Sequence, residues 1–282
     1  MERGHWDGLS LIGPLWPAAM AETPEIPERN IRLLIEYDGS AYNGWQRQPG
    51  QPTIQGSIEH ALSKILGHTP TLQVAGRTDS GVHALAQVAN FTVRSKILDW
   101  QFARGINNFL PKDISIHRSE EVPLSFNARF NSSSKYYRYR VYHGPQPAAL
   151  DRGRAWWLLS PVDMDLLEKA AALLLGQHDF NAFRSAHCDA DHAIREIYSI
   201  EITKAARPPL GYYVDIVFHA NAFCRHMCRI LAGTIVETGL GKFELENIQE
   251  ALDKKDREYA GVTAPPGGLT LLEVVYPEAE KA

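Results

Sequence analysis

The sequence predicts an α+β protein built from two ferredoxin-like halves, with sheets that join side by side and leave a cleft between them. Three observations lead to this prediction. The first half of the chain reads as β-α-β-β-α-β, the second half repeats that order without repeating residue identities, and a glycine-flanked loop joins two strands of the first half. The β-α-β-β-α-β order is the pattern of a ferredoxin-like unit.

The elements of the first half follow from periodicity and from the residues that end them. A strand rich in branched and aromatic residues runs over 31–37. Thr53 caps a helix that Gly67 stops, and a second helix starts at Asp99 and ends before Pro111. Their inward residues are Ile54, Ile58, Ala61, Leu62 and Ile65 in the first helix, and Phe102, Ile106, Phe109 and Leu110 in the second. Further strands are expected at 72–75, 85–93 and 114–117.

The second half is predicted in the same way. Strands are expected at 135–143, 194–203, 212–219 and 269–275. A helix begins at Pro161 and Asp163, stops at Gly176, and turns Leu166, Leu167, Ala170, Leu174 and Leu175 inward. Two more helices are expected at 223–238 and 244–254.

Three segments make up the predicted domain organisation. Residues 30–130 form an N-terminal half with the glycine-flanked loop, and residues 131–282 form the C-terminal half. Residues 1–29 are expected to be a disordered extension, because prolines and tryptophans interrupt any period. An apolar stretch after Leu9 is a weak match to a signal peptide, and translation starting at Met20 is a further hypothesis.

Composition limits the classes of function. The net charge of −4 and pI of about 6.3 count mildly against a nucleic-acid binder, although a local basic stripe is what meets phosphate. Three cysteines, an odd number, argue against a disulfide framework and fit a reducing cytoplasm. No apolar run approaches the roughly 18 residues of a membrane span.

The glycine-flanked loop, residues 75–84, carries the strongest chemical signal. It places Arg77 and Asp79 two residues apart, between Gly76 and Gly81, where a scaffold can present catalytic side chains. The alternative is ordinary turn chemistry, in which the aspartate caps its own backbone.

Two basic segments lie in the second half. The strand 135–143 alternates Lys135, Tyr137, Tyr139 and Val141 on one face with Tyr136, Arg138, Arg140 and Tyr142 on the other. This pattern suits phosphate contact and base stacking, or an amphipathic strand with solvated arginines. Arg225, His226 and Arg229 form a basic patch near the start of the helix 223–238, where cations oppose the helix dipole and so favour a role in binding.

Two other site types are weakly supported. Cys188, Cys224 and Cys228 with nearby histidines suggest zinc, but a Cys-x3-Cys pair on a helix lacks the spacing of a zinc knuckle, so we expect no metal. Ser80, beside Asp79 and near His83, suggests a serine hydrolase. Triad members, however, ordinarily come from distant parts of a chain.

Seven motifs in order resemble the tRNA pseudouridine synthase A family over roughly residues 30–277. The loop Gly-Arg-Thr-Asp-Ser-Gly-Val-His-Ala is similar to the family's signature, with Ser80 where alanine is usual. The other motifs are Tyr37-Asp38-Gly39 with Gly44-Trp45-Gln46-Arg47-Gln48, Phe126-Asn127-Ala128-Arg129-Phe130, Lys135-Tyr136-Tyr137-Arg138-Tyr139, His178-Asp179-Phe180 with Phe183-Arg184, Asn221-Ala222-Phe223 through Arg229, and Gly268-Leu269-Thr270-Leu271 with Tyr276-Pro277.

The resemblance implies the pseudouridine synthase fold and an isomerase that converts uridine to pseudouridine at positions 38, 39 or 40 of the tRNA anticodon stem-loop. It implies Asp79 as the catalytic aspartate, attacking C1′ or C6 or removing the 2′-proton. Tyr137 would stack on the target base, and Leu269 would form an apolar wall of the uracil pocket. Arg229 would pair with Asp79, while Arg77 would either pair with it or fill the gap left by a flipped base. The reaction needs no cofactor and no metal.

The resemblance also implies partners. Candidate contacts to RNA phosphate are Arg129, Arg138, Arg140, Arg152, Arg154, Arg184 and Arg225. A homodimer that binds tRNA in the cytoplasm, away from membranes, is expected. The Ser80 hydroxyl could hydrogen-bond the Asp79 carboxylate. An RNA-binding module without catalysis stays open as an alternative, and it would not need Asp79.

Overall fold

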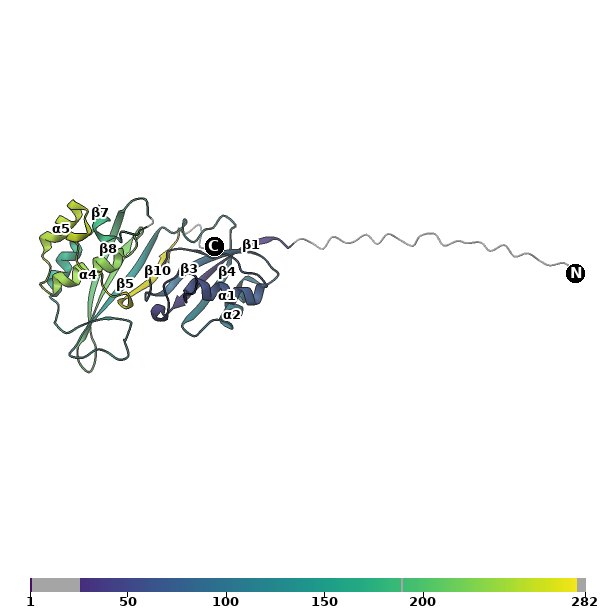
Figure 1. The fold of residues 1–282 in the computed structure, drawn as a ribbon, viewed down its shortest axis with the longest axis horizontal. Helices are drawn as coiled ribbons and strands as arrows, with labels where there is room; N and C mark the ends of the chain where they lie inside the picture. Colours follow the sequence, from purple (N-terminus) through teal and green to yellow (C-terminus); the bar gives the residue numbers. More distant parts are fainter. Residues whose placement is uncertain (2–25, 189, 278–282) are drawn as a thin grey trace.

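A single mixed sheet runs through the molecule (Figure 1). The computed structural model describes residue 1, residues 26–188 and residues 190–277. Within those residues ten strands pair, eight of them in the order β4-β1-β3-β10-β5-β9-β8-β7, with β2 on β3 and β6 on β5. This mixed α+β architecture is the predicted fold class.

The first half forms one ferredoxin-like unit. Its elements are β1 (Glu28–Tyr37), α1 (Ile54–Leu66), β2 (Gln73–Val74), β3 (His83–Arg94), α2 (Asp99–Asn107) and β4 (Ile114–Val122). Thr53 Oγ1 accepts a hydrogen bond from Gly56 N at 3.3 Å, a cap that contributes about 1 kcal/mol. Gly67 ends α1 at a φ of 77°. Both predicted ends of this helix are confirmed.

The second half repeats the arrangement with additions. Its main elements are β5 (Ser134–His143), α3 (Met164–Ala172), β8 (Ile194–Ala206), β9 (Tyr212–Ala220), α4 (Met227–Gly239), α5 (Leu245–Lys254) and β10 (Leu269–Val275). Two short strands, β6 (Trp156–Leu158) and β7 (Gly176–Asp179), were not predicted. The 3₁₀ turns η1 to η4 cover Gly39–Ala41, Phe180–Phe183, Arg257–Tyr259 and Pro266–Gly268.

The two sheets join through β10, the last of the described strands. β10 pairs antiparallel with β5 and parallel with β3, where Thr270 lies opposite His83 and Leu271 opposite Ala84. The predicted side-by-side joining of the sheets is therefore confirmed, and the loop that precedes β3 lies at the junction.

Three sequence predictions about helix boundaries are wrong. Helix α2 ends at Asn107, and Phe109, expected to point inward, is 50% exposed. Helix α3 ends at Ala172, so Leu175 is 42% exposed and Gly176 begins β7. Helix α4 begins at Met227 and not at Phe223, because His226 takes a left-handed conformation with φ of 64° that interrupts the helix.

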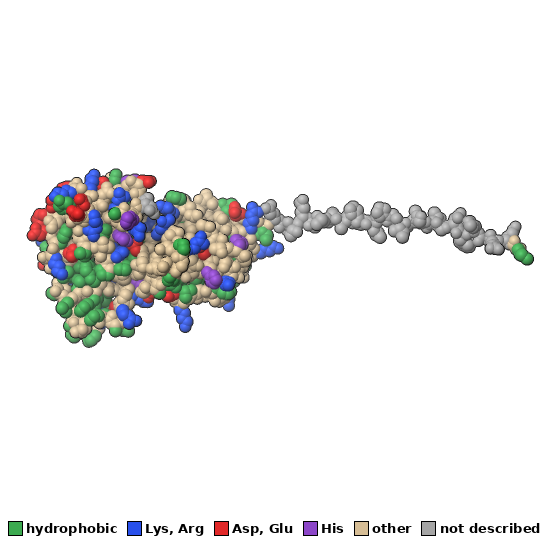
Figure 2. Space-filling view, viewed as in Figure 1, with side chains coloured by type: hydrophobic (Ala, Val, Ile, Leu, Met, Phe, Trp, Pro, Cys, Tyr) green, Lys and Arg blue, Asp and Glu red, His purple; other side chains and the backbone are tan. Residues whose placement is uncertain are grey.

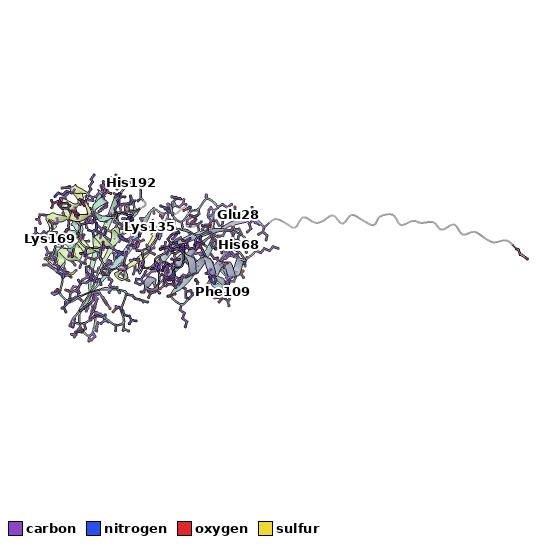
Figure 3. The ribbon with its side chains drawn as sticks, in the orientation of Figure 1. Glu28, His68, Phe109, Lys135, Lys169 and His192 are labelled. Carbon is purple, nitrogen blue, oxygen red and sulfur yellow. The ribbon has the colours of Figure 1, made fainter. Side chains whose placement is uncertain are left out.

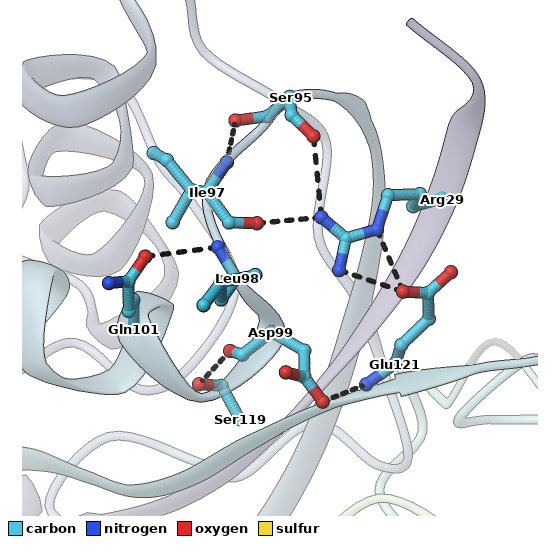
Figure 4. A network of polar contacts seen from close by, with 8 residues as sticks. All are labelled: Arg29, Ser95, Ile97, Leu98, Asp99, Gln101, Ser119 and Glu121. Atoms are coloured by element: carbon cyan, nitrogen blue, oxygen red, sulfur yellow. Dashed lines mark hydrogen bonds and ion pairs between the residues drawn. The ribbon is translucent and has the colours of Figure 1, made fainter.

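Polar contacts fix the start of α2 against the edge of the sheet (Figure 4). Arg29 of β1 pairs with Glu121 of β4 at 2.7 Å and donates to the carbonyl of Ile97 at 2.6 Å. Asp99 Oδ2 accepts from the Glu121 amide, and Ser119 Oγ donates to the carbonyl of Asp99 at 2.6 Å. These contacts hold α2 at the far side of the first half from β10.

The predicted N-terminal extension, 1–29, is only partly described. Residues 2–25 lie outside the described residues, and with them the signal-peptide and Met20 hypotheses. Strand β1 already begins at Glu28. Among the described helices, none has the length and apolar character needed to cross a membrane.

Candidate active site

The loop that carries Asp79 is hydrogen-bonded to strand β1 and to the segment that precedes α1. The Thr78 carbonyl accepts from the Trp45 amide at 3.0 Å, and the Thr78 hydroxyl lies 2.8 Å from the Tyr37 hydroxyl. The Val82 amide donates to the Asp79 carbonyl at 3.2 Å and closes the turn, with Gly81 at φ of 78°. Burial raises the pKa of Tyr37 to about 12, so it stays a neutral phenol.

Gly44 allows the preceding segment to lie directly on this loop. It has a φ of 81°, and a Cβ at that position would be 2.6 Å from the Thr78 carbonyl oxygen and 3.0 Å from the Asp79 carbonyl carbon. Any side chain would therefore displace the residues that carry the carboxylate. The Gly-Trp-Gln-Arg-Gln motif thus supports the position of Asp79.

Two side chains from the second half approach the Asp79 carboxylate. Arg229 Nη1 lies 3.5 Å and His226 Nε2 lies 3.7 Å from Asp79 Oδ2. Arg229 is fixed from behind, because its Nε donates to the Ala264 carbonyl at 2.9 Å. The predicted pairing of Arg229 with Asp79 is the arrangement found, and residues 150 positions apart in the sequence meet at the junction of the halves.

His226 was predicted only as part of a basic patch and not as a site residue. Burial lowers the pKa of His226, and the nearby Arg229 and Arg225 lower it further, whereas Asp79 raises it. The net lowering favours the neutral imidazole. Its left-handed backbone precedes α4 and turns its ring to Asp79. An unusual φ in a non-glycine residue commonly marks a functional position, and this signal cannot be read from sequence.

Tyr137 lies on the same face of the sheet as this cluster. Register pairs place Tyr37, Ala84, Leu271, Tyr137 and Phe218 in one row across five strands. The Tyr137 ring is buried and meets the Phe223 ring edge-on, with centroids 5.2 Å apart. Burial raises its pKa well above the ordinary value, and Asp79 adds to that effect, so the phenol is neutral and near the carboxylate.

A polar network holds the end of the loop that leads into β3. His83 Nδ1 accepts from the Gly39 amide and lies 3.1 Å from Asp38 Oδ1, and its Nε2 lies 2.7 Å from the Gly153 carbonyl. Arg154 pairs with Asp38 at 2.7 Å. Burial opposes ionisation of Asp38, but hydrogen bonds from Ser40 and Arg154 outweigh it and lower its pKa to about 2.

These contacts leave no support for a hydrolytic Ser80. Both ring nitrogens of His83 are engaged by backbone groups and by Asp38, away from Ser80. The Ser80 hydroxyl donates to the Tyr42 carbonyl at 3.1 Å. The expectation that it would hydrogen-bond Asp79 is therefore wrong, since the hydroxyl anchors the loop to the segment after η1.

The remaining predicted residues are distributed over several positions. Arg77 is exposed on the loop, and Leu269 is buried at the start of β10, opposite Tyr139. Arg184 donates to the Ala190 carbonyl and the exposed Arg225 to the His187 carbonyl, on segments that adjoin the start of α4.

The alternation predicted for β5 is found, and it separates its arginines from Asp79. Lys135, Tyr137 and Tyr139 are buried on the face that also carries Asp79, His226 and Arg229. Arg138 and Arg140 lie on the opposite face. There Arg140 pairs with Asp215 at 2.6 Å, a partner that the sequence did not reveal.

The three cysteines are free thiols. Cys224 and Cys228 are buried, Cys188 is partly buried, and burial raises the pKa of Cys228 well above the ordinary value. Within residues 26–188 and 190–277, no group of three or more His, Cys, Asp or Glu side chains is arranged to hold a metal ion.

Comparison with known proteins identifies the family. The sequence pattern described as tRNA pseudouridine synthase matches residues 33–131 and 170–277. The chain belongs to the tRNA pseudouridine synthase family. Asp79, His226 and Arg229 lie inside the matched ranges, and Tyr137 lies in the stretch between the two ranges.

Relatives that carry the name tRNA pseudouridine synthase A match nearly nine-tenths of this chain. The protein of Geotalea daltonii is 44% identical over 248 residues, 88% of this chain and 100% of its own length. That of Caldicellulosiruptor bescii is 43% identical over 88% of this chain and 100% of its own length. That of Myxococcus xanthus is 41% identical over 252 residues, 89% of this chain and 94% of its own length.

Proposed function

We propose that this member of the tRNA pseudouridine synthase family isomerises uridine to pseudouridine at positions 38, 39 or 40 of the tRNA anticodon stem-loop. The observation that carries the proposal is the meeting of Asp79 with Arg229 and His226 beside the buried Tyr137, at the junction of the two halves. The family and the names of its relatives supply the substrate class.

The reaction breaks the C1′–N1 bond and forms a C1′–C5 bond, while C5 loses a proton and N1 gains one. No electrons are gained or lost, and no water is consumed, so the chemistry needs a carboxylate and a proton acceptor but no redox group. Asp79 attacks C1′ or C6, or removes the 2′-proton, and Arg229 lies 3.5 Å from its carboxylate as the neighbouring cation. Each of the three routes requires an anionic Asp79.

Tyr137 and Leu269 are proposed as the walls against which the uracil turns. The Tyr137 ring is fixed by Phe223, and holding the uracil against this neutral ring is proposed to expose C5, so that its proton can leave to solvent. Arg77, exposed two residues before Asp79, is proposed to fill the gap left when the base leaves its stack. Extruding a base costs a few kcal/mol, which phosphate contacts must offset.

Several finer points belong to this proposal. The N-terminal half is assigned to residues 30–130 and the C-terminal half to residues 131–282, after an extension over 1–29. Arg129, Arg184 and Arg225 are the proposed phosphate contacts, whereas Arg138 lies on the face of β5 opposite to Tyr137. We also propose a homodimer that acts in the cytoplasm without cofactor or metal.

Tritium release from tRNA transcript labelled at uridine C5 tests the proposal. Wild type and Ser80→Ala are expected to release tritium, because the Ser80 hydroxyl only contacts the Tyr42 carbonyl. Asp79→Ala is expected to release none. No release from any variant, with tRNA still bound, would indicate an RNA-binding module without catalysis. Activity that depended on Ser80 and not on Asp79 would restore the hydrolase alternative.

A further inference from the structure

Lys135 is a buried lysine without an acidic partner among the described residues. It is 8% exposed, on the face of β5 that also carries Tyr137. The buried arginine and glutamate of the described chain each have an opposite charge: Arg32 pairs with Glu120, and Glu59 with Arg47. No ion pair of Lys135 is found among the described residues, although an unpaired buried charge costs several kcal/mol.

The surroundings of the Lys135 ammonium group are fixed and positive. Its Nζ donates to Ser132 Oγ at 2.9 Å, and the Ser132 hydroxyl in turn donates to the Arg129 carbonyl at 3.1 Å. One of the three ammonium donors is used by that contact. Burial and the nearby Arg129 guanidinium lower the pKa of Lys135 to about 8, so two cations adjoin each other without a counter-charge from the described residues.

Lys135 also lies close to the catalytic loop. Its Cε would be 3.4 Å from a Cβ placed on Gly76, so the lysine stem passes directly over the residue before Arg77. Tyr137 follows two residues later on the same face, about 7 Å along the strand. In Figure 3, Lys135 lies between the first half, marked by His68 and Phe109, and the second, marked by Lys169. Figure 2 shows Lys and Arg side chains near this junction.

We propose that Lys135, together with Arg129, binds a phosphate group of the RNA backbone next to the uridine that reacts. The described residues supply no negative charge to this site, and a phosphate diester supplies one together with acceptor oxygens for the remaining ammonium donors. Its place beside Gly76 puts the bound phosphate within reach of the nucleotide held between Asp79 and Tyr137. The inference rests on the proposed function, because the phosphate is that of the tRNA substrate.

The test compares tRNA binding by wild type, Lys135→Met and the control Lys64→Met, an exposed lysine of α1. At pH 7 we expect Lys135→Met to weaken affinity about tenfold and to reduce the slope of log affinity against log salt by about 1. Lys64→Met should change neither. The second variant, Arg129→Gln, alters an exposed side chain and is expected to weaken binding a few-fold.

Two readouts separate phosphate binding from a structural role. Methionine keeps the stem over Gly76 and removes an unpaired buried charge, so Lys135→Met should unfold at the same temperature as wild type or higher. Bound phosphate requires the protonated lysine, so the affinity ratio between wild type and Lys135→Met should fall from about tenfold at pH 7 to about twofold at pH 9.

The outcomes also separate this inference from the function on which it rests. If the wild-type protein releases tritium from tRNA, and Lys135→Met binds tRNA with the same affinity and the same salt slope as wild type, the phosphate site is refuted and the isomerase function stands. A wild-type protein that binds tRNA but never releases tritium would refute the isomerase instead. A Lys135→Met variant with a lower unfolding temperature and unchanged salt slope would make Lys135 a structural residue.

Discussion

Replacing Gly44 with alanine should displace the loop that carries Asp79, although Gly44 is not itself a residue of the site. At a φ of 81° an alanine costs about 1–2 kcal/mol, because its Cβ meets the following carbonyl oxygen. The same Cβ would lie 2.6 Å from the Thr78 carbonyl oxygen and 3.0 Å from the Asp79 carbonyl carbon. Relieving those contacts moves the loop by a good part of an ångström, and forcing extra bulk into a packed region costs about 1–3 kcal/mol more.

The expected consequence is a loss of both stability and rate. Summing the two terms, the free energy of unfolding should fall by about 2–5 kcal/mol, which urea denaturation measures. A reacting group displaced by about 1 Å can lose about a hundredfold in rate, so tritium release should fall about ten- to a hundredfold. The protein is expected to remain folded at 25 °C.

Gly50 provides the matched control. It has a φ of 70°, but a Cβ there would have no atom within 4 Å. Gly50→Ala should therefore lose about 1 kcal/mol of stability and keep wild-type activity. If Gly44→Ala released tritium at the wild-type rate, the loop would not be positioned by the contact with Gly44, and the reasoning would be refuted.

Two further predictions concern the charged groups around the site. Arg229→Met removes a cation 3.5 Å from Asp79, and we expect tritium release to fall about 10²–10³-fold while tRNA affinity changes little; an unchanged rate would exclude Arg229 from catalysis. Folding lowers the pKa of Asp38 to about 2, so the ionised Asp38 carboxylate stabilises the folded state above about pH 4. This contribution is lost as the pH falls from about 4 towards 2. Asp38→Asn should therefore show a smaller loss of stability between pH 5 and pH 3 than wild type in urea titrations, by less than about 1 kcal/mol because the carboxylate is partly exposed; equal losses would contradict the assignment.

Local patterns in the sequence predicted most elements, and failed where tertiary contacts decide. The alternation of strand 135–143 divided its residues correctly between two faces, because side chains of a strand alternate, but it did not show which face is buried. Strand β6, with three residues paired in parallel to β5, has too few residues to show any period. Phe109 and Leu175 continue the apolar period past the last turns of their helices, so periodicity extended both helices too far.

The sequence predicted those site residues that belong to recognisable motifs. Asp79 and Arg229 could be named from the resemblance, and the structure brings them together. The role of His226 beside Asp79 depends on a backbone conformation that periodicity treats as ordinary helix. Lys135 could not be distinguished from a solvated strand lysine, because its lack of an acidic partner depends on which distant residues pack around it.

Strand β10 has a consequence for the order in which the chain becomes functional during synthesis. It follows both β3 and β5 in the sequence, yet it lies between them in the sheet. The segment Leu269–Val275 is therefore synthesised after the two strands that it joins. Before it is added, Asp79 and Arg229 belong to units that no described strand connects. We therefore expect the carboxylate and its cation to be held together only once β10 has been made and has paired.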